Sequence, residues 1–225
     1  NIKNIYQTDR QFKQIGAEII GAPNLDSLAE ILDITIKSLE ELKINNITVD
    51  FTLPSISRYL EKKLNPNKKN NLLIKEAMDN KNIHLIKDKK YNYIKGIIEL
   101  SGPIEKAKKV FRNIKFPKPV DLMIKNFFRD VSKIKKNYPA LSVTLDITEA
   151  QSFLKYKDLA FKIYNKDNAN TLAVGGNYQV NNKESGVGIT IMVNNIIDSV
   201  SCNKNKRVYI PYNVNIGKHL IKTKK

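Results

Sequence analysis

The sequence predicts an α+β fold in which an antiparallel sheet is built from two separated parts of the chain. Segments with the period-two alternation of half-buried strands occur near both ends, in residues 10–21, 47–53, 143–147, 159–163 and 187–193. Between the two groups, residues 55–139 carry apolar side chains at helical spacing. Strands joined by short turns, with the helices grouped in blocks, are typical of an antiparallel α+β sheet.

Changes in this pattern divide the chain into four segments. We expect the first part of the core in residues 1–54 and a mostly helical insertion in residues 55–139. The second part of the core is expected in residues 140–202, and a C-terminal strand with a basic tail in residues 203–225. The last predicted strand covers residues 207–210, and a short helix over 194–200 is expected to precede it.

The composition indicates one globular core, with room for a small appended unit. The chain has 225 residues, of which 41% are hydrophobic. No apolar run approaches the roughly 18 residues of a membrane span, so no membrane partner is expected. The single cysteine, Cys202, cannot form an intrachain disulfide and fits a reducing compartment, which predicts a cytoplasmic location.

The net charge of +17 invites a nucleic-acid interpretation, but the kind of basic residue argues against it. Only five of the 39 basic residues are arginine, which leaves 34 lysines. Arginine is the preferred side chain for bidentate contacts with phosphates and bases, and tryptophan is absent. Lysine, asparagine and isoleucine are also the residues that an AT-rich genome tends to encode. We therefore expect salt-sensitive, non-specific binding of RNA and no specific nucleic-acid partner.

The first strand has two unlike faces. One is apolar and carries Ile15, Ala17 and Ile19. The other carries Phe12 followed by Gln14, Gly16 and Glu18, which make it mostly polar. An amide and a carboxylate around a glycine predict the floor of a small polar pocket, because glycine lets a ligand approach the backbone. The same pattern also fits an edge strand with one solvated face.

Three helices are predicted, one in the first part of the core and two in the insertion. A stripe of leucine and isoleucine from Leu25 to Leu42 predicts an amphipathic helix, and Ser27 with Glu30 fits a capping box at its start. Two further helices are expected over residues 104–114, started by Pro103, and over 120–134.

Motifs for other chemistries are missing from the sequence. The two histidines, His84 and His219, share no ligand-like spacing with Cys202, so neither a metal site nor a nucleophile–base pair is predicted. The chain also lacks the glycine-rich phosphate loop and the dinucleotide fingerprint. We expect no catalytic residue, no metal and no cofactor.

Residues 10–21, followed by Ala-Pro-Asn-Leu-Asp over 22–26 and Ala-Glu over 29–30, resemble the end of motif 2 in histidyl-tRNA synthetase-like proteins. They are most similar to the non-catalytic branch of that family, the regulatory subunits of ATP phosphoribosyltransferase. The resemblance implies the core fold of class II aminoacyl-tRNA synthetases, interrupted by the helical insertion.

Two later segments extend the resemblance, with key residues changed. Residues 146–156 resemble the Asp-Pro-x-Glu and Arg-Gly-Leu-Asp-Tyr-Tyr motifs, but Gln151 stands at the arginine position. Residues 175–178 resemble Gly-Gly-Arg-Tyr, with Asn177 in place of the arginine.

A third segment, residues 184–195, resembles motif 3. Asn194 and Asn195 replace its Glu-Arg pair, whose arginine contacts ATP in the synthetases. Arginine supplies a fixed positive charge that an amide cannot, so amino-acid activation is not expected.

The resemblance implies a vestigial histidine-like pocket. Its expected residues are Gln14, Glu18, Gln151, Tyr156, Gly175, Gly176 and Tyr178. The matching glutamine and glutamate contact histidine in the synthetases, so Gln14 and Glu18 are expected to face the polar end of one amino acid, with Lys155 as a candidate partner for Glu18. Weak histidine binding and a water-filled vestige both remain open.

The resemblance implies a non-enzymatic regulatory subunit that acts in histidine biosynthesis by binding the short catalytic subunit of ATP phosphoribosyltransferase. Two alternatives are a degenerate or truncated histidyl-tRNA synthetase and a synthetase-derived RNA-binding protein. Motif 1, which builds the dimer interface of the superfamily, would precede Asn1, so a homodimer is expected of a form that contains it. Whether the chain is trimmed or naturally short is open.

Overall fold

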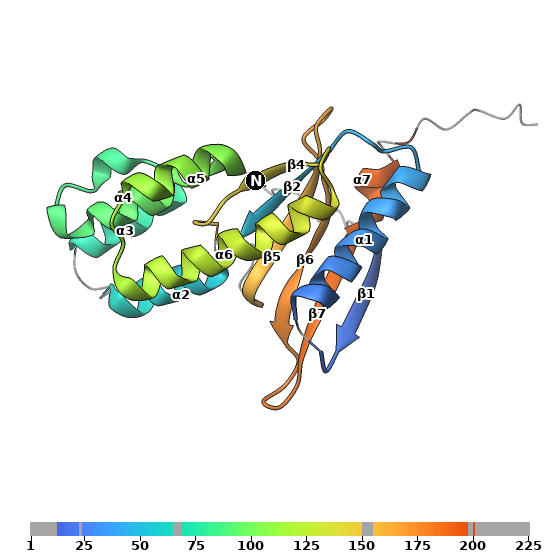
Figure 1. Cartoon of the computed structure of the whole chain (residues 1–225), viewed down its shortest axis with the longest axis horizontal. Coiled ribbons are helices and arrows are strands. Elements are labelled where there is room, and N and C mark those ends of the chain that lie inside the picture. Colours follow the sequence, from blue (N-terminus) through green and yellow to red (C-terminus); the bar gives the residue numbers. More distant parts are fainter. Residues whose placement is uncertain (1–12, 23, 65–68, 150–154, 198–199, 201–225) are drawn as a thin grey trace, which may run out of the picture.

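A seven-stranded sheet packs beside a group of helices (Figure 1). The structure, a computed structural model, describes all residues except 1–12, 23, 65–68, 150–154, 198–199 and 201–225. The strands are β1 (Gln14–Ile20), β2 (Ile47–Thr52), β3 (Gly102–Pro103), β4 (Ser142–Leu145), β5 (Tyr156–Asn165), β6 (Thr171–Gln179) and β7 (Ser185–Met192). The α-helices are α1 (Leu25–Glu41), α2 (Pro54–Lys63), α3 (Lys69–Asp79), α4 (Asn92–Glu99), α5 (Ile104–Asn113), α6 (Lys118–Asn137) and α7 (Val193–Ile197). Two short 3-10 helices are η1 (Ile83–Leu85) and η2 (Lys89–Tyr91).

The order of the strands is β1-β7-β6-β5-β2-β4-β3, and five of the six neighbouring pairs are antiparallel. The pair β2–β4 is parallel, which corrects the prediction of a purely antiparallel sheet. Parallel neighbours need a long crossover connection, and the helical segment between β2 and β4 provides one. The predicted α+β class is confirmed.

One face of the sheet is apolar, and α1 and α6 cover it (Figure 1). Phe51 on β2 and Phe161 on β5 are paired in register, are fully buried, and lie 6.1 Å apart between ring centroids. At the far end of α6, the hydroxyl of Tyr138 donates a hydrogen bond to the carboxylate of Asp33 on α1. The two covering helices are thus joined to each other as well as to the sheet.

The predicted stripe on the first helix is confirmed, but its cap differs. Asn24 is the N-cap residue, and its Oδ1 accepts a hydrogen bond of 2.8 Å from the Ser27 N–H. Ser27 therefore lies inside the helix, and the predicted capping box of Ser27 with Glu30 is wrong. An asparagine cap satisfies a backbone donor of the first turn as well as a serine does.

The helices after β2 follow the prediction in part. Helix α6 contains the stretch predicted over 120–134, and α5 matches the one predicted over 104–114 up to Asn113, with Pro103 at its N-cap. Helix α4 was not predicted, because Gly96 interrupts its short apolar pattern. A Cβ at Gly96 would lie 2.8 Å from Cδ1 of Ile114, so close packing explains this glycine. The segment boundaries at residues 54, 139 and 202 stay a prediction.

Both ends of the described chain show smaller differences. Ile15, predicted on the buried face of the first strand, is 60% exposed, because it lies at the start of an edge strand. The helix predicted over 194–200 forms as α7, which begins one residue earlier and ends at Ile197. The strand predicted over 207–210 lies outside the described residues. Within the described ranges, none of the helices has both the length and the apolar character needed to cross a bilayer.

An ionic cluster joins the helical segment to the sheet. Lys81, which follows α3, pairs with Asp146 beyond β4, and Lys162 on β5 pairs with Glu149. Between them, Asp50 on β2 accepts a hydrogen bond from the hydroxyl of Thr144. Burial raises the pKa of Asp50 from 3.8 to about 6, and repulsion by Asp146 and Glu149 acts in the same direction.

The Asp50 carboxyl makes stability depend on pH. Between about pH 4 and pH 6 the folded chain holds a proton that the unfolded chain has released, so the contribution of neutral Asp50 is lost as pH rises. Asp50→Asn cannot ionise and keeps a hydrogen-bonding side chain. We expect it to raise the free energy of unfolding by up to about 3 kcal/mol at about pH 8 and to change it little at about pH 4.

Urea unfolding at the two pH values measures this difference. Asp79→Asn, at an exposed carboxylate ending α3, is the matched control and should change stability by less than about 0.5 kcal/mol at either pH. An Asp50→Asn variant that is equally destabilised at both pH values would show that the Asp50 charge is needed by the cluster.

Candidate functional site

The face of the sheet opposite α1 and α6 carries most of the predicted pocket residues. The strand register places Glu18 of β1 opposite Gly188 of β7, and Gly188 opposite Gly176 of β6. Tyr178, two residues beyond Gly176, lies opposite Tyr156 of β5. Because alternate residues of a strand share one face, these five residues lie on one continuous surface, which we call the open face.

Glu18 and Tyr178 meet above Gly188. The Tyr178 hydroxyl donates a hydrogen bond to the Glu18 carboxylate, and this bond, after burial, raises the pKa of the phenol. A Cβ at Gly188 would lie 3.1 Å from Cε1 of Tyr178 and 3.2 Å from Cγ of Glu18. A side chain at this position would therefore press against both residues. The alternating pattern predicts Gly188 only as part of a strand. Its place in the segment that resembles motif 3 is the signal that could have identified it as a site residue.

Tyr156 lies on the same side of the sheet, but it is buried. It is 2% exposed and packs with Ala160, Val174 and Tyr178. Its hydroxyl donates a hydrogen bond of 3.4 Å to the Val174 carbonyl, and burial raises its pKa to about 12. The ammonium of Lys155 lies 5.1 Å from the centre of the Tyr156 ring. Lys155 thus contacts this aromatic ring, and the described partner of Glu18 is Tyr178.

Gln14 lies at the exposed start of β1. Its Nε2 is 3.6 Å from Sδ of Met192 on the neighbouring strand. Four residues of extended strand separate Gln14 from Glu18, which corresponds to roughly 13 Å. The expectation that both side chains face the same polar end of one amino acid is therefore wrong.

The glycine pair of β6 is divided between the two faces. A Cβ at Gly176 would lie 2.7 Å from Cβ of Ala160 on the open face. A Cβ at Gly175 would lie 2.7 Å from Cζ of Phe161, on the face that α1 and α6 cover. Gly175 therefore makes room for the core and does not line the pocket. Gln151, also predicted for the pocket, lies outside the described residues.

The three asparagines at charge-bearing motif positions have different surroundings. Asn195 donates a hydrogen bond of 2.6 Å to the Thr171 carbonyl, and Oδ1 of Asn194 accepts one of 3.0 Å from the Lys13 N–H. These amides attach α7 to β6 and to the start of β1. Asn177 is paired opposite the fully buried Val187, which places it on the covered face. The change at Asn177 therefore does not act on the open face.

The ionic cluster beside the open face is the one grouping of metal-ligating side chains among the described residues. Oxygens of Asp50, Asp146 and Glu149 lie within 4.8 Å of one another. Lys81 and Lys162 already neutralise two of these carboxylates. We assign no metal here.

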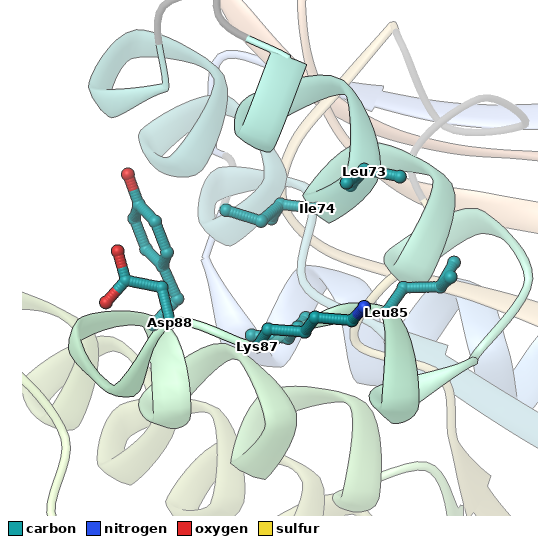
Figure 2. Close-up of a pocket in the computed structure, with 7 residues that line it drawn as sticks. Leu73, Ile74, Leu85, Lys87 and Asp88 are labelled. Carbon is teal, nitrogen blue, oxygen red and sulfur yellow. The ribbon is translucent and has the colours of Figure 1, made fainter.

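A separate apolar cavity of about 290 Å³ lies in the helical segment (Figure 2). Leu73 and Ile74 of α3 form one wall, and Leu85 and Lys87 form another. Asp88 at its rim pairs with Lys90 at 3.1 Å. The cavity is away from the sheet and brings no reactive groups together.

Comparison with known proteins agrees with the fold. A sequence model described as Histidyl-tRNA synthetase matches residues 3–196. The chain is 23% identical to the ATP phosphoribosyltransferase regulatory subunit of Paramagnetospirillum magneticum, over 90% of this chain and 55% of that protein. It is 22% identical to the subunit of the same description from Gluconobacter oxydans, over 91% and 55%.

Solved structures resemble it as well. An ATP phosphoribosyl transferase (HisG:HisZ) complex from Thermotoga maritima contains a chain with a TM-score of 0.61 and 25% identity, covering 80% of this chain and 65% of that chain. Histidyl-tRNA synthetase from Nostoc sp. PCC 7120 has a TM-score of 0.61 and 15% identity, covering 84% and 50%, which shows the fold alone. The predicted class II synthetase-like core is thus confirmed.

The chain spans about half the length of the curated relatives that it matches. The family model nevertheless covers most of this chain, including β1 and all the strands that form the open face. The chain belongs to the histidyl-tRNA synthetase family.

Proposed function

We propose that this chain is the synthetase-like core of a non-catalytic regulatory subunit of ATP phosphoribosyltransferase, the enzyme of the first step of histidine biosynthesis. One observation carries the proposal: Glu18, Tyr156 and Tyr178 are kept together on the open face, while the two positions that match the Glu-Arg pair of motif 3 hold amides with structural bonds. A pocket that is kept without charges for activation fits a regulator.

The partner that we propose is the short catalytic subunit. The relatives reported above are described as regulatory subunits of this enzyme, and a similar chain occurs in the complex from Thermotoga maritima. We further propose that a form containing motif 1 is a homodimer. The cytoplasm is the compartment that fits a chain with Cys202 as its single cysteine.

The absence of catalysis is proposed on chemical grounds. Adenylate formation requires positive charge at the phosphates of ATP, and arginine supplies it in a fixed, bidentate form. Asn195 cannot do so, and its amide is already hydrogen-bonded to the Thr171 carbonyl. The position of Gln151 adds a second neutral amide where the family motif has an arginine.

The open face supplies what a regulator needs, namely a site whose occupancy can differ between two states of the complex. Glu18 offers a carboxylate to an ammonium or imidazolium group, and the half-buried ring of Tyr178 lies beside it. Gln14, roughly 13 Å along β1, offers an amide at the other end. We propose that this is a vestigial histidine-like pocket with low affinity.

Complex formation is the most direct test of the proposed function. At about 0.2 M salt, where phosphate contacts are strongly weakened, we expect the chain to co-elute with the short catalytic subunit of its own organism in size-exclusion chromatography. RNA is expected to dissociate under the same conditions. RNA that stays bound, without a protein complex, would favour the synthetase-derived RNA-binding protein instead.

Histidine-dependent exchange between ATP and pyrophosphate tests for a remaining synthetase activity. We expect exchange no faster than in a protein-free control, because the charged groups for activation are replaced. Turnover above that control, abolished by Glu18→Ala, would identify a degenerate histidyl-tRNA synthetase and contradict the regulatory proposal.

Calorimetric titration with free histidine tests the pocket itself. We expect a dissociation constant no tighter than about 0.1 mM, which corresponds to roughly −5.5 kcal/mol. Any binding should weaken in Tyr178→Phe, which loses the hydrogen bond that orients Glu18. Glu30→Ala, an exposed carboxylate on α1, is the control that should leave it unchanged. Micromolar binding abolished by Glu18→Ala would show a functional histidine site.

A further inference from the structure

The apolar cavity of the helical segment has the size of a site for a small ligand. Its volume of about 290 Å³ is close to the lower limit of the roughly 300–1,000 Å³ that ligand pockets have. One wall comes from α3, and the other comes from residues 85–91 in η1 and η2 (Figure 2). A molecule in this cavity would therefore contact two separate elements of the segment.

The walls of the cavity are mostly aliphatic. Ile74 and Ile86 line it from opposite walls, are each 2% exposed, and belong to the core. Leu73 and Leu85 are half-buried and continue these walls. Water next to such side chains finds few polar partners, so an alkyl chain that displaces it is favoured.

The one carboxylate that lines the cavity is already engaged. Asp88 caps η2, and its Oδ1 accepts a hydrogen bond of 3.0 Å from the Lys90 N–H. The ammonium of Lys90 lies 3.1 Å from Oδ2 of Asp88 and 4.7 Å from the centre of the Tyr91 ring. Asp88 and Lys90 thus compensate each other, so this carboxylate offers no free charge to a ligand.

Lys87 is the remaining charged residue of the cavity lining. It forms no ion pair with any residue of the ranges that the structure describes. Figure 2 shows its side chain extended along the cavity, with the ammonium pointing away from the Asp88 carboxylate. Its aliphatic stem therefore lines the wall, and its ammonium can meet an anion at the opening.

The charge of the surrounding segment acts in the same direction. Residues 55–139 contain 22 basic and 8 acidic residues, a net charge of +14. The other 140 residues of the chain together have a net charge of +3. Clustered charge of one sign raises the local concentration of oppositely charged small molecules. The segment that contains the cavity therefore favours anions.

We infer that the cavity binds a small aliphatic carboxylate, with its alkyl chain against Ile74 and Ile86 and its carboxylate on the ammonium of Lys87. A single ammonium balances a single negative charge, whereas a phosphate monoester carries about −1.5 to −2 at pH 7. The inference does not depend on the proposed function, because the cavity lies in the helical segment, away from the sheet and its open face.

Titration with hexanoate, followed by the methyl chemical shifts of the protein, tests the inference. We expect saturable shifts centred on Leu73, Ile74 and Leu85, with a dissociation constant of about 1 mM. Hexan-1-ol has the same chain without the charge and should bind about fivefold more weakly. Acetate has the charge without the chain and should not saturate. Equal affinity for hexanoate and hexan-1-ol, saturation by acetate, or shifts centred elsewhere would overturn the assignment.

A pair of lysine variants tests the contact with the carboxylate. Lys87→Gln should weaken hexanoate binding about fivefold and leave the affinity for hexan-1-ol unchanged. Lys89→Gln removes an exposed lysine two residues away that does not line the cavity, so it is the matched control and should bind both compounds as the parent does. Equal weakening in the two variants would show a general effect of positive charge and reject the site.

A pair of leucine variants tests the contact with the alkyl chain. The ring of Leu73→Phe should occupy part of the cavity and weaken both hexanoate and hexan-1-ol about tenfold. Leu72→Phe is the control, because Leu72 is 57% exposed and lies outside the cavity lining. Unchanged affinity in Leu73→Phe would contradict the assignment. If Leu73→Phe does not fold, the two lysine variants decide by themselves.

Discussion

The separation of the sheet into an apolar and a polar face is the constraint on which the rest of this structure depends. Phe51 and Phe161, paired in register and fully buried, contribute about 1.5–3 kcal/mol each by leaving water. Gly175 makes this possible, because a Cβ there would lie 2.7 Å from the Phe161 ring. Side chains alternate along a strand, so a slip of one residue would expose Phe161 and turn the polar residues inward. The strand register that buries Phe161 therefore also fixes which side chains lie on the open face.

The open face owes its geometry to backbone as much as to side chains. Gly188 allows Glu18 and Tyr178 to meet over β7, and Gly176 allows β6 to pack against Ala160 of β5. Neither glycine carries a functional group, yet each removes a Cβ that would displace its neighbours. Tyr156 is buried under this face, while Glu18 and Tyr178 lie at its surface.

The substitutions at charge-bearing motif positions do not have one meaning. Asn194 and Asn195 have gained structural hydrogen bonds that attach α7, so their loss of charge is compensated by a new use. Asn177 has no such bond at Oδ1 among the described residues. The three amides therefore differ in what they do for the fold. The ionic cluster at Asp50 differs from all of them, since lysines already balance it.

The sequence by itself determined the α+β class, the strands of the core and helix α1, because alternation and helical spacing are local properties of the chain. The family resemblance pointed to Glu18, Tyr156 and Tyr178, which lie on one face of the sheet and stay a prediction as a pocket. The sequence also predicted helices α5 and α6, although not α4, where Gly96 weakens the pattern. Only the tertiary structure decided that β2 and β4 run parallel, that Gly175 and Asn177 lie on the covered face, and that Asn24 caps α1. Motif neighbours such as Asn177 and Tyr178 point to opposite sides of a strand, and a motif does not state which face meets the helices. That choice depends on packing between residues far apart in the sequence, which no local pattern encodes.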